Sequence, residues 1–447
     1  MKKTKVAQLA AGLAAVAFAS VAAAQTAQTA PTAKAPAQVV KPPIAQAWMD
    51  VATFSGMGMP GMGGAAASPM AMIGSLLGGG PGGQGGKNSF GMTQTGSAGR
   101  WLDVTLSTSR NPALSEAQQA VPAGSALAPT LKLVAPKAAK GTPPTPSDDS
   151  VIEPEFERPK GRMLLYWGCG DTVRAGQPRV LDMATAKPDD FQKFFVSRRA
   201  TQRGAHSAVG RPLWPNEADA RMLPGQASLV GEHVLSGPGV PEGFKFAIPA
   251  AQDLMPAIQL KQGDVAGATM LEWAALPTAR AYFIGAMGAK GGGGGGTEAE
   301  MVFWTSSELP EVGMGLVDYQ TNAAVDRWLK EGVLLERGIT RCTVPKGIFG
   351  AEGGAMLRMI AYGSELNLAF PPRPTDPRIA WEPDWALKLR VKSVANAILG
   401  MDMGAGMGSM LRGETGQPTD PTAPAAEKKE EPKKIDALNI LRGILGR

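Results

Sequence analysis

The feature that most constrains the fold is a series of strand-like hydrophobic patterns between residues 252 and 372. Residues 269–273 alternate apolar with less apolar side chains, and residues 281–285 and 300–305 are rich in aromatic and β-branched side chains. Such patterns are typical of β-strands. Pro277 separates the first pair, and the six glycines at 291–296 separate the second, as expected of a turn and a hairpin loop. The chain is therefore predicted to be mainly β.

Two stretches of this region resemble a fibronectin type III module. The spacing of Trp273 and Tyr282, with Ala279 and Ala281 between them, is similar to the second and third strands of that family, and residues 357–364 are similar to its sixth strand. The resemblance implies an antiparallel β-sandwich over residues 252–398 and carries no catalytic residues. We expect Trp273 and Tyr282 on adjacent antiparallel strands, with Trp273 in the core.

A short helix is predicted to be inserted in this module, over residues 321–330. Thr321 or Asn322 can cap its first turn, and Gly332 ends it. Val325, Trp328 and Leu329 form one apolar face. We expect the helix to cover the open end of the sandwich. A protrusion that binds a partner is the alternative.

Further strand patterns extend along the rest of the chain and favour two or more sandwich-like modules. They lie at residues 47–52, 100–106, 127–134, 162–167, 179–182, 228–235, 244–248 and 385–391. The predicted organisation is a signal peptide (1–24), a disordered lead-in (25–46), a small β unit (47–136) with a Gly/Met-rich loop (55–94), a linker (137–159), a middle β-rich region (160–251), the sandwich (252–398), a Gly/Met-rich tract with a Pro/Lys/Glu linker (399–434) and a short amphipathic segment (435–447).

The N-terminus predicts export. Lys2, Lys3 and Lys5 precede an apolar stretch at 6–21, and three alanines at 22–24 form a small-residue cleavage site. No later stretch is long and apolar enough to cross a bilayer. The mature protein is expected in the periplasm of a Gram-negative envelope or outside the cell. Removing three lysines lowers the net charge from +6 to +3, which argues against a nucleic-acid partner.

The two cysteines, Cys169 and Cys342, would enter an oxidising compartment, where a disulfide between them is the default expectation. Two buried, inert thiols are the alternative. A third hypothesis is a thiol enzyme or hydrolase in which Cys169 is the nucleophile and His206 or His233 the base. Cys169 lies between two glycines and has no family signature around it, so this hypothesis ranks below the disulfide.

Two tracts combine glycine with closely spaced methionines. Thioethers select Cu(I), and three of them can surround one ion, so these tracts suggest a copper-binding protein as an alternative function. Methionine also fills irregular apolar contacts, which is the simpler interpretation. The candidate metal ligands are Met57, Met59, Met62, Met70, Met72, Met401, Met403, Met407 and Met410. No other cofactor is expected.

A basic loop inside the middle region carries a candidate anion-binding set. Arginines beside an aromatic ring can hold phosphate or carboxylate groups of envelope polymers. A solvated loop without a ligand is the preferred interpretation. The residues are Arg198, Arg199, Arg203, Arg211 and Trp214.

The last residues form a candidate partner-binding segment. Ile435, Leu438, Leu441 and Leu445 share one side of a helix, which would fold on a partner's groove. A frayed tail is the alternative.

Taken together, the sequence predicts an exported envelope protein without catalytic activity that binds or scaffolds another envelope protein or an anionic envelope polymer.

Overall fold

The structure is a computed structural model that describes residues 38–56, 88–95, 98–127, 129–137, 161–198, 204–290, 300–349 and 355–400. It divides into two compact units. The smaller comprises Met1–Val40 and Pro374–Trp381, in which Val40 pairs with Trp381 in an isolated β-bridge. The larger unit holds the rest of the chain and carries all the features below.

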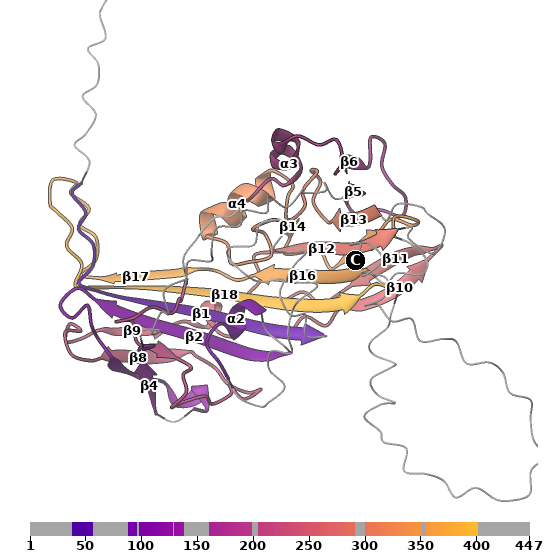
Figure 1. Cartoon of the computed structure of the whole chain (residues 1–447). Coiled ribbons are helices and arrows are strands. Elements are labelled where there is room, and N and C mark those ends of the chain that lie inside the picture. The colour runs from indigo at the N-terminus through magenta and orange to yellow at the C-terminus, as the bar shows by residue number, and fades with distance from the viewer. Residues whose placement is uncertain are drawn as a thin grey trace, which may run out of the picture. The chain divides into compact units, whose positions relative to one another are not determined.

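The larger unit is built on one 15-stranded mixed sheet, and the prediction of a mainly β protein is confirmed (Figure 1). Thirteen strands follow one another in the order β6 (Arg179–Asp182), β5 (Arg162–Trp167), β13 (Glu300–Thr305), β12 (Ala281–Lys290), β16 (Met356–Tyr362), β18 (Trp385–Ile398), β1 (Ala45–Gly56), β2 (Gly99–Thr108), β7 (Leu213–Trp214), β4 (Thr130–Val134), β3 (Glu116–Ala120), β8 (Gly231–Ser236) and β9 (Lys245–Ile248). Two more strands belong to the sheet but lie outside this order. β14 (Leu335–Glu336) pairs with β12, and β17 (Leu366–Phe370) pairs with β18.

The centre of the sheet joins the two ends of the described chain. β1 pairs in parallel with β18 over twelve positions, from Ala45 opposite Trp385 to Gly56 opposite Asn396. On its other side β1 pairs antiparallel with β2. A second parallel pair is formed by β5 and β13. These long-range pairings bring strands from all three predicted β regions into one sheet, while the predicted domain boundaries themselves stay predictions.

A separate three-stranded sheet contains β10 (Lys261–Val265), β11 (Ala268–Glu272) and β15 (Arg341–Val344), all antiparallel. The expectation that Trp273 and Tyr282 lie on adjacent strands is wrong, because Trp273 follows β11 in this sheet and Tyr282 lies on β12 in the large one. Trp273 is nevertheless in the core, as expected, and its ring packs edge-on against that of Tyr282 at 5.5 Å. The two residues meet across the core between the sheets.

Successive side chains along a strand point to opposite faces of the sheet, and the two faces belong to different hydrophobic clusters. On β1, Met49 and Val51 belong to the main cluster, which also includes Leu271 and Cys342 of the small sheet. Residues on the other face, such as Ala52 and Phe54, belong to a second cluster. The helices in the described part of the chain are α2 (Met92–Thr95), α3 (Pro188–Phe194) and α4 (Asn322–Lys330), with single 3₁₀ turns at Ala123–Ser125 and Ala250–Gln252.

The predicted inserted helix is confirmed as α4. Thr321 caps it by accepting a hydrogen bond from the Ala324 N–H at 3.2 Å, and Gly332, with a φ of +70°, follows its end. Val325 and Trp328 are buried in the second cluster. Figure 1 shows α4 beside β12 and β16. Among the described helices none has both the length and the apolar character needed to cross a bilayer.

Candidate functional site: a buried ionic cluster and a disulfide-linked turn

Charged side chains gather on the second-cluster face of β1, β2, β16 and β18. Asp50 on β1 lies opposite Asp103 on β2 and Arg390 on β18. We define the ionic cluster by six residues that come from these four strands and from the segment after β13; they are Asp50, Asp103, Asp318, Arg358, Arg390 and Lys392. All except the partly buried Asp318 are buried. Burial of this many charges demands specific partners.

The strongest pair is formed by Arg390 and Asp50. The Arg390 Nε–H donates to Asp50 Oδ1 at 2.7 Å, and its Nη2–H donates to Oδ2 at 2.6 Å. This two-point geometry is the most favourable one between a guanidinium and a carboxylate. Burial lowers the pKa of Arg390, but the carboxylate beside it more than offsets this and raises the pKa above its ordinary value.

The same pair holds a connecting segment on the sheet. The backbone N–H of Ala205 donates to Asp50 Oδ2 at 3.0 Å. A Cβ built on Gly204 would lie 1.6 Å from Arg390 Nη2, so a glycine is required where the backbone crosses the ion pair. Because Gly204 has no side chain, the backbone of this segment can pack directly against the Arg390 guanidinium.

Asp103 accepts hydrogen bonds from uncharged groups and forms no ion pair with the residues that the structure describes. The Gly91 N–H donates to its Oδ1 at 3.0 Å, and the Thr93 hydroxyl donates to its Oδ2. Burial raises the pKa of Asp103 to about 7, with a smaller contribution from Asp50, although both hydrogen bonds act in the opposite direction. Asp103 thereby holds the start of α2 against the sheet.

Lys392 and Asp318 form the third contact of the cluster. Lys392 Nζ lies 3.3 Å from Asp318 Oδ1 and 4.1 Å from the centre of the Tyr319 ring. Burial lowers the pKa of Lys392 to about 8, against the opposing effect of Asp318. The pKa of Asp318 is lowered because Lys392 and Arg390 together outweigh its burial. The segment that carries Asp318 and Tyr319 is therefore fixed over β18.

Shifted pKa values are also common in active sites, so the burial and contacts of the six side chains must decide between a chemical and a structural role. Five of its six side chains are shielded from solvent, and most of their polar atoms contact one another or backbone groups. What the arrangement does in this structure is anchor three connecting segments on one face of the sheet. Sequence reasoning missed it, because Lys388, Arg390 and Lys392 alternate with apolar residues, as on the solvated face of a strand.

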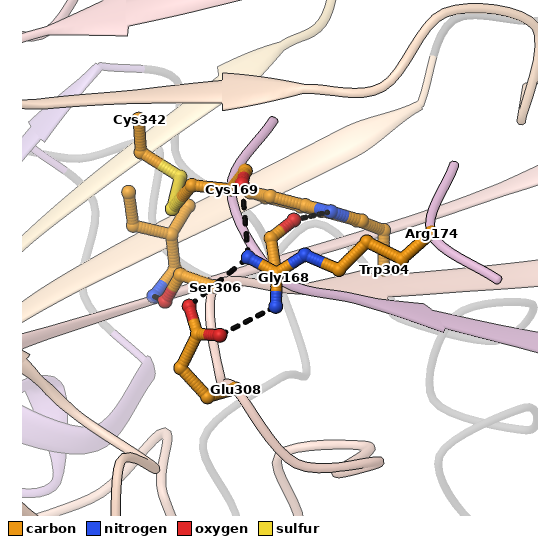
Figure 2. The surroundings of a disulfide bond; sticks show 8 residues. Gly168, Cys169, Arg174, Trp304, Ser306, Glu308 and Cys342 are labelled. Carbon is orange, nitrogen blue, oxygen red and sulfur yellow. Dashed lines mark hydrogen bonds and ion pairs between the residues drawn. A yellow bond between two sulfur atoms is a disulfide. The ribbon is translucent and has the colours of Figure 1, made fainter. Parts of the chain in front are cut away.

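A disulfide joins Cys169, in the turn after β5, to Cys342 on β15, with 5.1 Å between the Cα atoms (Figure 2). The predicted bond is confirmed, and it links the large sheet to the small one. Backbone contacts accompany it, since the Gly168 N–H donates to the Thr305 carbonyl and the Gly170 N–H to the Thr343 carbonyl, both at 2.9 Å. In the bonded state Cys169 has no thiolate, so it cannot be a nucleophile.

Arg174 closes the disulfide-linked turn on its exposed side. Its Nη2–H donates to the Cys169 carbonyl at 3.1 Å, and its guanidinium pairs with the Glu308 carboxylate, as Figure 2 shows. The Trp304 Nε1–H donates to the Gly168 carbonyl at 3.1 Å. A Cβ on Gly168 would lie 2.4 Å from the Arg174 guanidinium carbon, so the arginine occupies the space that a side chain would need.

The predicted anion-binding arginines are only partly described. Arg198 pairs with Glu311 and, at 2.9 Å, with Glu331, and it stacks 4.8 Å from the centre of the Trp328 ring. Arg211 hydrogen-bonds to the His206 ring. Trp214 is fully buried, so an anion on the surface would meet the arginines without it. Arg199 and Arg203 lie outside the described residues.

The two histidines have structural roles in the described part of the chain. His233 is fully buried and shares hydrogen bonds with the Leu229 carbonyl at 2.8 Å and the Gln119 amide at 3.1 Å. Burial lowers its pKa, which favours the neutral ring. His206 Nδ1 lies 2.9 Å from the Gly204 carbonyl. Among the described residues, neither histidine hydrogen-bonds to Cys169, whose sulfur is bonded to that of Cys342.

The remaining predicted site residues lie outside the described ranges. These are Met57, Met59, Met62, Met70, Met72, Met401, Met403, Met407 and Met410 of the copper hypothesis, and Ile435, Leu438, Leu441 and Leu445 of the partner-binding segment. Within the described ranges, no group of three or more His, Cys, Asp or Glu side chains is placed to hold a metal ion.

Comparison with known proteins gives no assignment: no protein-family model and no curated protein sequence matches this chain.

Proposed function

We propose that this protein is exported to the cell envelope and acts there as a non-catalytic binding or scaffolding protein. The observation that supports the proposal best is where the Gly/Met-rich segments join the sheet. The strands that border them are neighbours, and the bordering residues lie at the same end of the sheet. We call this end the convergent end; it is defined by Gly56, Gly99, Lys290, Glu300, Met356 and Ile398.

The register of the strands places these residues together. Gly56, before residues 57–87, lies opposite Asn396 near the end of β18, which precedes residues 401–447. Met356, after residues 350–354, lies opposite Ile398. Lys290 and Glu300, on either side of residues 291–299, lie opposite each other. Segments distant in the sequence therefore start from adjoining strands.

Such an arrangement is suited to binding. A broad sheet, held by the ionic cluster and the disulfide, carries the attachment points of Gly-rich and Gly/Met-rich segments at one end, and methionine adapts readily to irregular partner surfaces. The disulfide agrees with export, because structural disulfides persist in oxidising compartments. Since Arg198 is engaged by two carboxylates of the protein, we favour another envelope protein over an anionic polymer as the partner.

The test is fractionation of the bacterial envelope with shortened variants. One variant replaces residues 59–85 by a short Gly/Ser linker, and a second lacks residues 435–447. A matched control replaces residues 138–158, which precede β5 at the same end of the sheet and contain no methionine, by a linker of the same kind. We expect the first variant to keep its melting temperature and lose its association with envelope fractions. Unchanged fractionation of both variants would contradict the proposal.

A copper-binding function is the second candidate, and the register of β1 and β18 favours it specifically. Because these strands are parallel neighbours, Gly56, directly before the tract from Met57 to Met72, lies opposite Asn396, shortly before the tract from Met401 to Met410. Titration of the mature protein with Cu(I) under reducing conditions separates the two candidates. We expect no sub-micromolar binding. Tight binding that is lost when Met57, Met59, Met62, Met70 and Met72 are replaced by Leu would establish the copper function instead.

A further inference from the structure

Two buried arginines of the ionic cluster differ in one respect. Arg390 on β18 uses the Nε–Nη2 edge of its guanidinium to hold both oxygens of Asp50. Arg358 on the neighbouring strand β16 is equally buried, with 2% of its surface exposed. Within the described structure, its Nε and Nη2 atoms have no hydrogen-bond partner. The edge left without a partner is the same one that Arg390 uses for a carboxylate.

A buried guanidinium without partners is strongly disfavoured. Burial lowers the pKa of Arg358 to about 10, with Asp318 and Tyr362 acting in the opposite direction, so the group is still charged at neutral pH. Its described aromatic neighbour is Phe54, whose ring centre lies 5.9 Å away. A cation–π contact at this distance cannot replace two charge-assisted hydrogen bonds.

The charges around Arg358 leave a local excess of positive charge. Lys392 Nζ lies 6.0 Å from the centre of the same Phe54 ring. The carboxylates of Asp50 and Asp318 are already paired with Arg390 and Lys392. Asp103 lies three strands away, on β2. A single small anion would neutralise this excess.

The residues opposite Arg358 on its two neighbouring strands are a glycine and an asparagine. Its register partner on β18 is Asn396, whose buried Oδ1 also has no hydrogen-bond partner among the described residues. Its partner on β12 is Gly285, which carries no side chain. The strand positions on the two sides of Arg358 therefore carry a polar amide and a glycine.

We propose that Arg358 is a binding site for a small carboxylate, held by its Nε–H and Nη2–H groups, with Lys392 adding positive charge. Two parallel N–H donors match the two coplanar oxygens of a carboxylate and do not match a halide in the same way. The site goes beyond the proposed scaffolding function and does not depend on it. The carboxylate can be a free small acid or belong to a larger molecule.

The probe is formate, the smallest carboxylate. The protein is dialysed into chloride at pH 7, and its melting temperature is followed as formate replaces chloride at constant ionic strength. We expect a saturable rise of about 2 °C or more, since a ligand that binds only the folded state stabilises it. Arg358→Met should abolish this rise. Arg337→Met, which removes an exposed guanidinium, should leave it unchanged.

A second measurement keeps the test valid if Arg358→Met does not fold. The ¹³C signal of labelled formate should broaden in the presence of the wild-type protein and sharpen again when acetate is added, but not when chloride is added. Equal melting temperatures in formate and chloride, with no broadening, would overturn the proposed carboxylate site. A rise that persists in Arg358→Met would show that formate binds elsewhere and would equally overturn it.

Discussion

Asp50 and Arg390 lie opposite each other on two parallel strands, although 340 positions separate them in the chain. Their two hydrogen bonds, at 2.7 and 2.6 Å, join the first and the last strand of the larger unit inside the protein. Gly204 and Ala205 cover the pair from outside the sheet. The ion pair therefore connects three distant parts of the chain at one point.

Removal of one partner of this pair should be strongly destabilising. Arg390→Met leaves the Asp50 carboxylate buried without its cation, and we expect the free energy of unfolding to fall by about 3–5 kcal/mol. The double variant Asp50→Leu with Arg390→Met should regain part of this loss, because no buried charge is left alone. Denaturant titration measures both. An effect of Arg390→Met no larger than that of the exposed Arg337→Met would contradict the expectation.

Asp103 should make stability depend on pH. Its pKa is about 7 in the folded protein, against an ordinary value of 3.8 in the unfolded chain, so between these values the folded state binds more protons than the unfolded state. Its contribution to stability is thus greatest below about pH 4 and is lost as the pH rises to about 7. Melting temperatures from pH 5 to pH 8.5 measure the effect.

The Asp103→Asn variant isolates this contribution from that of other groups. The lowered pKa of His233 acts in the opposite direction, because the unfolded state gains the proton first as the pH falls. Asparagine resembles the protonated aspartic acid, so the variant and the wild type should be close in stability at pH 5. At pH 8.5 the variant should be the more stable. A difference between the two proteins that does not change with pH would rule out a raised pKa.

Loss of the disulfide should weaken the protein by about 3–5 kcal/mol, because the bond closes a long loop over a sequence separation of 173. Cys342→Ala together with Cys169→Ala should lower the melting temperature without exposing a reactive thiol. Thiol labelling of the wild type, denatured without reductant, should give no modified cysteine. Two labelled thiols per chain would show that the bond is not formed in the mature protein.

Trp273 should contribute substantially to the core between the two sheets. It is buried, with 5% of its surface exposed, and packs on Tyr282. Trp273→Ala should reduce the free energy of unfolding by about 3–5 kcal/mol, and Trp273→Phe, which keeps an aromatic ring, should cost less. Chemical denaturation of the two variants gives both values. Equal effects of the two changes would indicate that the ring does not pack against Tyr282.

Local patterns in the sequence were sufficient to locate several of the strands. Residues 162–167, 179–182 and 300–305 form strands with the predicted bounds, because alternation and β-branched or aromatic content act within a few residues. The helix after Thr321 could be predicted for the same reason, since its cap and apolar face are local. Short strands such as Leu213–Trp214 and Leu335–Glu336 have too few residues for a pattern.

The disulfide was predictable from the composition and from the predicted export, because two cysteines allow one pairing. The partners of the strands were not predictable, since pairing is decided between segments hundreds of residues apart, as for β1 and β18. The same holds for Trp273 and Tyr282, which are close in sequence yet belong to two sheets.

The ionic cluster shows most clearly which features could not be predicted from the sequence alone. Arg390 and Lys392 alternate with apolar residues in the way that a half-exposed strand does, and their type predicts contact with water. Only the tertiary structure decides otherwise, because the segments that carry Gly204 and Asp318 cover that face and supply the backbone and carboxylate partners. The period of a strand is determined by its own residues. Whether its polar face meets water or another part of the chain depends on what packs there, and that contact exists only in the folded molecule.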